Sequence, residues 1–186
     1  TVVAARFLAS STQLTTVDSG GGLYLWNEDG RLIRHANTEG RITRVSISES
    51  GRTLTLTASG LVQTWNQALE IVGEFPLVDP FAPDVVLSPD GDLVFVGRDQ
   101  WPFTLSRVDG LPSTLQGADS MYVQAFSPSG DWIFASNASE RPLLWSRSVP
   151  LGIPLARHRG MVTAAAFSND GDSLITASEQ GELRAW

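Results

Sequence analysis

The sequence predicts an all-β fold made of repeated antiparallel sheets. Its 186 residues contain five copies of a unit that opens on an apolar residue, turns through a polar stretch and closes on a β-rich run. The units open at Phe7, Ile47, Leu87, Phe126 and Phe167, and they close at Trp26, Trp65, Leu105, Trp145 and Trp186. Both landmarks recur about every 40 residues, which is typical of one supersecondary unit repeated along a chain. No stretch has the apolar spacing of an amphipathic helix, so essentially no helix is expected.

Each unit divides into β-rich runs separated by polar turns. In the first two units we expect strands at Val2–Phe7, Gln13–Val17, Leu23–Trp26, Arg31–His35, Ile42–Ile47, Thr53–Thr57, Leu61–Trp65 and Glu70–Phe75. In the third and fourth units we expect them at Asp84–Leu87, Leu93–Val96, Pro102–Leu105, Leu111–Leu115, Tyr122–Phe126, Trp132–Ala135, Pro142–Trp145 and Gly152–Leu155. The fifth unit supplies three strands, at Met161–Phe167, Ser173–Ala177 and Glu182–Trp186.

The first turn of four units ends on a Gly. Residues 88–91 and 127–130 also place Pro at the second turn position, where its fixed φ suits a type I turn. Residues 48–51 and 168–171 keep the Gly without the Pro. Gly is expected there because the last turn position requires a positive φ.

Two of the predicted strands are apolar on both sides, at Leu93–Val96 and Trp132–Ala135. A strand covered on both faces has this pattern. Radial repetition of four-stranded sheets gives each sheet a neighbour on both faces, so the predicted architecture is a β-propeller. Its blades would span about 1–36, 41–76, 83–116, 121–156 and 161–186.

The pattern Phe-Ser-x-Asp-Gly, then Ser, Gly and Trp, resembles the WD-repeat (WD-40) β-propellers over essentially the whole chain. In that family a His, a Ser, a Trp and an Asp form a buried hydrogen-bonded set that stabilises each blade. The fifth unit is the best copy, and the resemblance identifies His158, Ser178 and Trp186 with the family's His, Ser and Trp. Trp26, Trp65 and Trp145 are the matching repeat positions in other units.

The departures from the family pattern are consistent. The Asp of the set would fall near Gln180 in the fifth unit and near Glu140 in the fourth. We therefore expect apolar packing and the sheets themselves to hold the blades, with the polar set mostly missing. The last unit also lacks a fourth strand, and an open sheet edge is prone to aggregation. We expect a segment of a longer chain; the alternative is a five-blade ring with a three-stranded last blade, or one completed by another chain.

Composition limits the classes of function. The 20 acidic residues outnumber the 13 basic ones, for a formal net charge of −7, which disfavours a nucleic-acid partner. No apolar run approaches the ~18 residues that a membrane-spanning helix needs. No secretory leader is visible, so a cytoplasmic location and no membrane partner are expected.

No catalytic, cofactor-binding or metal-binding residue is predicted. The chain has two His and no Cys, and neither His has a second ligand at metal-site spacing. The Asp-Gly-Asp turns at residues 90–92 and 170–172 offer too few oxygens for calcium.

The resemblance implies that the loops that join blades, and those between second and third strands, gather on the face that WD-repeat propellers generally use for partners. Here they carry Arg98, Trp101, Arg141, Arg157, Arg159 and Phe81, and exposed Arg and aromatic residues dominate many interfaces. We expect a non-enzymatic protein–protein interaction scaffold, or a sensor or regulatory module of a larger signalling-type protein. Its partner would be a protein or another domain of its own chain. The alternative is a propeller enzyme or a small-ligand-binding propeller with its site at the central channel.

Overall fold

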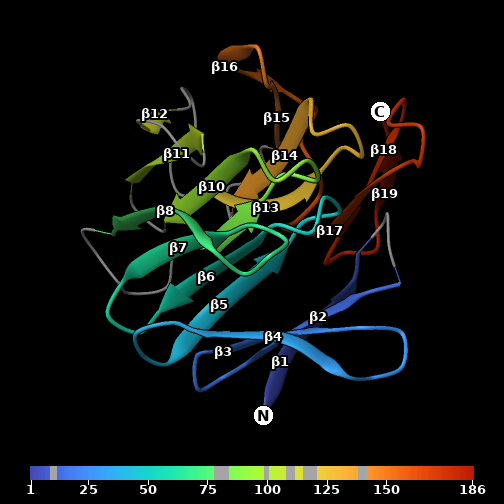
Figure 1. The fold of residues 1–186 in the computed structure, drawn as a ribbon. Helices are drawn as coiled ribbons and strands as arrows, with labels where there is room; N and C mark the ends of the chain where they lie inside the picture. Colours follow the sequence, from blue (N-terminus) through green and yellow to red (C-terminus); the bar gives the residue numbers. More distant parts are fainter. Residues whose placement is uncertain (9–11, 78–83, 99–100, 108–111, 115–120, 138–141) are drawn as a thin grey trace. The chain divides into compact units, whose positions relative to one another are not determined.

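The protein consists of antiparallel β-sheets, which confirms the predicted fold class. The computed structural model describes residues 1–8, 12–77, 84–98, 101–107, 112–114, 121–137 and 142–186. These residues form 19 strands and no helix (Figure 1). In this part of the chain there is accordingly no helix with the length and hydropathy required to span a membrane.

The strands form five sheets, in each of which consecutive strands are neighbours. The first two sheets contain β1 (Val2–Phe7), β2 (Leu14–Asp18), β3 (Gly22–Trp26) and β4 (Leu32–Asn37), then β5 (Ile42–Ile47), β6 (Thr53–Thr57), β7 (Leu61–Trp65) and β8 (Ile71–Pro76). The third contains β9 (Asp84–Leu87), β10 (Leu93–Arg98), β11 (Trp101–Arg107) and β12 (Pro112–Thr114). The last two contain β13 (Met121–Phe126), β14 (Trp132–Asn137), β15 (Leu143–Ser146) and β16 (Val149–Pro154), then β17 (Val162–Phe167), β18 (Leu174–Ser178) and β19 (Leu183–Ala185).

The inner strands lie where the sequence predicts them, and the outer strands differ more. The bounds of β1, β5, β6, β7 and β9 are the predicted ones. The largest difference is β16, which begins at Val149 and not at Gly152 because a two-residue turn at 147–148 closes the hairpin with β15. Pro150 and Pro154 both lie in β16, although Pro is a poor strand residue. As the outermost strand of its sheet, β16 tolerates them, since an edge strand needs no second set of N–H donors.

The predicted Gly turns are confirmed. Gly51, Gly91, Gly130 and Gly171 have φ values of 79°, 75°, 76° and 80°. The Ser that opens each turn adds a bond that the sequence reading did not foresee. In the turn after β9, for example, the Ser88 hydroxyl accepts the N–H of Leu93 at 3.0 Å. Ser48, Ser127 and Ser168 make equivalent bonds.

The first strand of four sheets contains a β-bulge. The register with the second strand shifts between Val2 and Ala4 in β1, and between Val162 and Ala164 in β17. The shift in β5 lies at the same place, and the shift in β13 lies two residues nearer to the end of the strand. A bulge increases the local twist of a strand and redirects its side chains. The repetition shows that the bulge belongs to the unit, although no residue type marked it in the sequence.

The chain divides into two compact units, Thr1–Val94 with Ser106–Leu111, and Phe95–Leu105 with Pro112–Trp186. In the first unit, Trp65 and Leu69 of the second sheet pack against Leu8, Val17, Leu23 and Leu25 of the first. In the second unit, Phe134 of the fourth sheet packs with Val162 and Leu174 of the fifth, and Trp186 covers this cluster. Each unit therefore has a core between the faces of successive sheets.

A hydrogen bond orients the Trp side chain in the first two sheets. The indole N–H of Trp65 donates to the Thr55 hydroxyl at 3.0 Å, and that of Trp26 donates to the Thr16 hydroxyl at 2.9 Å. In both sheets the Thr precedes the Trp by ten residues. Trp65 is 2% exposed, whereas Trp26 is only half-buried.

This difference in burial gives a test. Thr55→Val leaves the indole N–H of Trp65 buried without an acceptor, at a cost of about 1–3 kcal/mol in the free energy of unfolding. Thr16→Val should cost less, because water can reach the half-buried indole of Trp26. Urea unfolding of both variants measures the two losses, and equal losses would contradict the explanation by burial.

Candidate functional site

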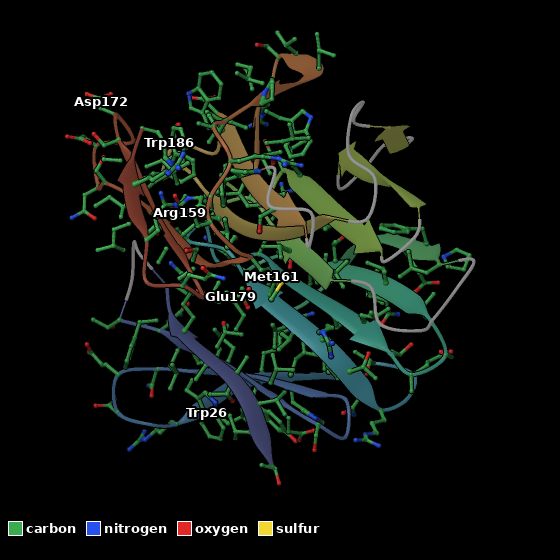
Figure 2. All side chains as sticks on the ribbon, turned by 180° about the vertical axis from the view of Figure 1, so that it is seen from behind. Trp26, Arg159, Met161, Asp172, Glu179 and Trp186 are labelled. Carbon is green, nitrogen blue, oxygen red and sulfur yellow. The ribbon has the colours of Figure 1, made fainter. Side chains whose placement is uncertain are left out.

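The loop of residues 156–161 connects β16 to β17 in the second unit. Its side chains alternate between exposed and buried positions from residue 157 to residue 161. Arg157, Arg159 and Met161 are exposed, and His158 and Gly160 between them are buried. The turn of residues 178–181, between β18 and β19, lies beside this loop, as the neighbouring positions of Met161 and Glu179 in Figure 2 show.

His158 fixes the buried side of the loop. One ring nitrogen, Nε2, lies 2.7 Å from the Thr176 hydroxyl, which also accepts the indole N–H of Trp186 at 3.0 Å. The His158 and Trp186 rings meet edge to face, with centroids 6.3 Å apart. A polar set therefore does form in the fifth sheet, and the expectation that it would be mostly missing is wrong there.

The hydroxyl in this set is that of Thr176, not that of Ser178. The Ser178 Oγ atom is buried and has no hydrogen-bond partner among the described residues. The sequence contained a signal for Thr176, because it precedes Trp186 by ten residues, as Thr55 precedes Trp65. The resemblance identified Ser178, two residues after Thr176, because the family position was matched to a Ser.

Glu182, the residue before β19, lies beside the set, although the Nδ1 atom of His158 makes no hydrogen bond among the described residues. Its Oε2 atom accepts the backbone N–H of Arg159 at 2.7 Å and lies 3.3 Å from Nδ1 of His158. Its Oε1 atom accepts two bonds from the Arg184 guanidinium, at 3.0 and 2.8 Å. The backbone N–H of Arg159 and the Arg184 guanidinium hold the pKa of Glu182 below its ordinary value. The sequence reading missed this residue because it looked for an Asp in the preceding turn.

A second acid fixes the end of the loop. Glu179 donates its backbone N–H to the carbonyl of Met161 at 2.9 Å, and its carboxylate accepts the N–H of Met161 at 3.3 Å. Gly160 has a φ of +89°, and a Cβ atom there would lie 2.9 Å from Cγ of Gln180. The loop from His158 to Met161 is thus fixed by Thr176 of β18 and by Glu179 and Glu182, which lie between β18 and β19.

The exposed side of the loop carries two free positive charges. Within the described residues, neither Arg157 nor Arg159 pairs its guanidinium with a carboxylate. The Met161 side chain is 39% exposed. Of the other predicted interface residues, Arg98 ends β10 and Trp101 begins β11, but their side chains lie outside the described part. Phe81 and Arg141 lie outside the described residues altogether.

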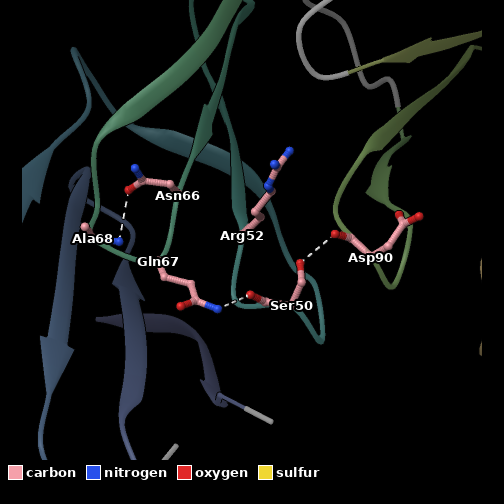
Figure 3. A pocket seen from close by; sticks show the side chains of 6 residues that line it. All are labelled: Ser50, Arg52, Asn66, Gln67, Ala68 and Asp90. Atoms are coloured by element: carbon pink, nitrogen blue, oxygen red, sulfur yellow. Dashed lines mark hydrogen bonds between the residues drawn. The ribbon is translucent and has the colours of Figure 1, made fainter. Parts of the chain in front are cut away.

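An open pocket of about 410 Å³ lies in the first unit, among the turns that follow β5, β7 and β9 (Figure 3). Its polar groups bond mainly to one another. The Gln67 amide donates to the carbonyl of Ser50 at 2.6 Å, and the Ser50 hydroxyl donates to the carbonyl of Asp90 at 2.7 Å. We interpret these bonds as joining the second and third sheets. No group of three His, Cys, Asp or Glu side chains that could hold a metal ion occurs in the described ranges.

Comparison with known proteins places the loop inside a known repeat. The family model "WD domain, G-beta repeat" matches residues 150–186, which include the whole candidate site. The structure is also similar to the crystal structure of the β-propeller domain of Cps50 (Swd1) from Myceliophteria thermophila, with a TM-score of 0.75 and 15% sequence identity. Residues 150–186 therefore match a WD repeat, and the chain as a whole has the fold of a WD-repeat β-propeller. The match covers 99% of this chain and 64% of that chain, so this propeller spans less than two thirds of that structure's length.

The polar set of the fifth WD repeat gives a test that separates Thr176 from Ser178. Thr176→Val removes the acceptor of the half-buried Trp186 indole and the partner of the buried His158. The buried His158 nitrogen left without a partner costs about 1–3 kcal/mol. Ser178→Ala removes an oxygen that has no partner, so it should change the free energy of unfolding by less than about 0.5 kcal/mol. Urea unfolding of both variants decides between them. A larger loss of unfolding free energy for Ser178→Ala would show that Ser178, and not Thr176, supplies the hydroxyl of the set.

The lowered pKa of Glu182 predicts an acid dependence of stability. Folding favours the ionised carboxylate, so its contribution is present above the ordinary pKa of 4.5 and is lost as the pH falls through the lowered pKa of the folded state. Glu182→Gln should therefore reduce the drop in unfolding free energy between neutral pH and pH values below 4.5. Urea titrations of wild type and variant across this range measure the change. Parallel curves would show that Glu182 does not contribute.

Proposed function

We propose that this WD-repeat propeller is a non-enzymatic protein-interaction module and that the 156–161 loop forms part of its partner-binding surface. WD40 propellers generally mediate protein–protein interaction. The observation that supports the 156–161 loop as a binding surface is that its backbone is fixed while its exposed side chains are free to contact a partner. His158, Glu179 and Glu182 hold the loop, while Arg157, Arg159 and Met161 project into solvent.

A fixed loop is well suited to binding. Ordering a flexible segment opposes association, so a loop that is already ordered loses less conformational entropy when a partner docks. Arg is enriched among the residues that dominate interface energies, and Met adapts to irregular apolar surfaces. The exposed side of the loop combines both residue types.

The finer proposal concerns the kind of protein. We infer a scaffold, or a sensor or regulatory module of a larger signalling-type protein, whose partner is a separate protein or another domain of the same chain. Arg98, Trp101, Arg141 and Phe81 stay in this proposal as further interface residues. It is supported by the WD-repeat architecture and by the exposed Arg and Met residues of the fifth repeat.

Affinity capture tests the proposed surface. The bait proteins are the wild type, a triple variant with Arg157→Ala, Arg159→Ala and Met161→Ala, and a control with Asn169→Ala and Asp172→Ala. The control changes exposed residues in the turn after β17, at the other end of that strand from the loop (Asp172 in Figure 2). Because all five side chains are exposed, each substitution should alter stability by no more than about 0.5 kcal/mol.

The expected result is a set of proteins, identified by mass spectrometry, that the wild type and the control recover and the triple variant does not. Thermal unfolding of the three baits verifies that all are folded. Equal recovery by all three baits would reject the loop as the binding surface.

A further inference from the structure

The free charges of the 156–161 loop are positive on an acidic protein. The chain has a net charge of −7, yet the exposed side of this loop carries two guanidinium groups that pair with no carboxylate of the described residues. The nearest acids do not neutralise them by contact. The Glu182 carboxylate is occupied by the N–H of Arg159 and by Arg184, and the Glu179 carboxylate accepts the N–H of Met161.

The two charges lie close together along the chain. Arg157 and Arg159 flank the buried His158, and both are exposed. Arg159 begins the bend of residues 159–160. A short acidic segment can bring two carboxylates to both guanidinium groups at once. Met161 continues the exposed side after the bend at Gly160.

We propose that this strip, Arg157, Arg159 and Met161, binds an extended acidic segment of a protein partner. The segment carries two carboxylates close together in its sequence and an apolar side chain beside them. The carboxylates meet the guanidinium groups, which can each donate two parallel hydrogen bonds, and the apolar side chain contacts Met161. The inference rests on the proposed function and adds the chemistry of the partner.

An acidic peptide fits the strip better than a nucleic acid does. A nucleic acid carries phosphates along its whole length and needs a basic surface that continues beside it. Here the carboxylates of Glu179 and Glu182 border the strip, and the protein as a whole is acidic. A short acidic segment places its charges only where the two guanidinium groups lie, and it uses the apolar surface of Met161.

Fluorescence anisotropy with labelled probes tests the proposal on the whole 186-residue chain. The probes are a short peptide containing Glu-Ser-Glu-Ser-Leu, its Gln-Ser-Gln-Ser-Leu counterpart, its Arg-Ser-Arg-Ser-Leu counterpart, and a short single-stranded oligonucleotide. The acidic peptide should bind the wild type on the order of tenfold more tightly than the Gln peptide does, and added salt should weaken its binding.

Charge reversal provides the matched control. The double variant Arg157→Glu and Arg159→Glu should lose the acidic peptide and bind the Arg peptide instead, which a merely destabilised protein would not do. Circular dichroism and thermal unfolding compare the fold of the variant with that of the wild type. A gain of Arg-peptide binding together with a loss of Glu-peptide binding supports the strip as the site.

Three outcomes would overturn the proposal: no binding of the acidic peptide, equal binding of the Glu and Gln peptides, or tighter binding of the oligonucleotide. The last outcome would assign the strip to nucleic acid. If the acidic peptide does not bind but the triple Ala variant still loses captured proteins, the proposed interaction function stands. Only the proposal that the partner segment is acidic is then rejected. If capture is unchanged in that variant, the proposed surface itself is wrong.

Discussion

The bond between a Trp indole and a Thr hydroxyl on the neighbouring strand is the constraint that the first, second and fifth sheets share. A large aromatic side chain can be buried between two sheets only if its N–H finds an acceptor. Trp65 lies opposite Thr53 in the register of β6 and β7, and it bonds to the diagonal neighbour Thr55 on the same face. The Trp is thereby held against the core residues of the preceding sheet.

In the fifth repeat the same bond also positions the candidate site. The Thr176 hydroxyl that accepts from Trp186 is in contact with His158, so the position of the loop follows from the packing of the Trp. Glu182 extends the set to the backbone of Arg159. The exposed strip is therefore fixed by the same interactions that stabilise the sheet. A partner would meet a surface that already has its bound shape.

Four of the turns each depend on one Ser and one Gly. A Ser after the last residue of the first strand caps the turn with its hydroxyl, and a Gly supplies the positive φ that ends it. The Gly could be predicted because backbone geometry at that position excludes most side chains. The role of the Ser could not, because a hydroxyl bond to a backbone N–H leaves no mark on the apolar pattern of the sequence.

The sequence by itself determined the repeat length, the bounds of β1, β5, β6, β7 and β9, and the closing Trp positions, because these depend on periodic burial and on turn chemistry within one unit. Only the tertiary structure decided what joins units and loops. It chose Thr176 over Ser178 and Glu182 over an Asp, and it placed a bulge in β1, β5, β13 and β17. It also left Arg157 and Arg159 free on a fixed loop. These outcomes depend on which polar atoms come within bonding distance after the sheets have packed, and spacing along the chain does not specify that distance.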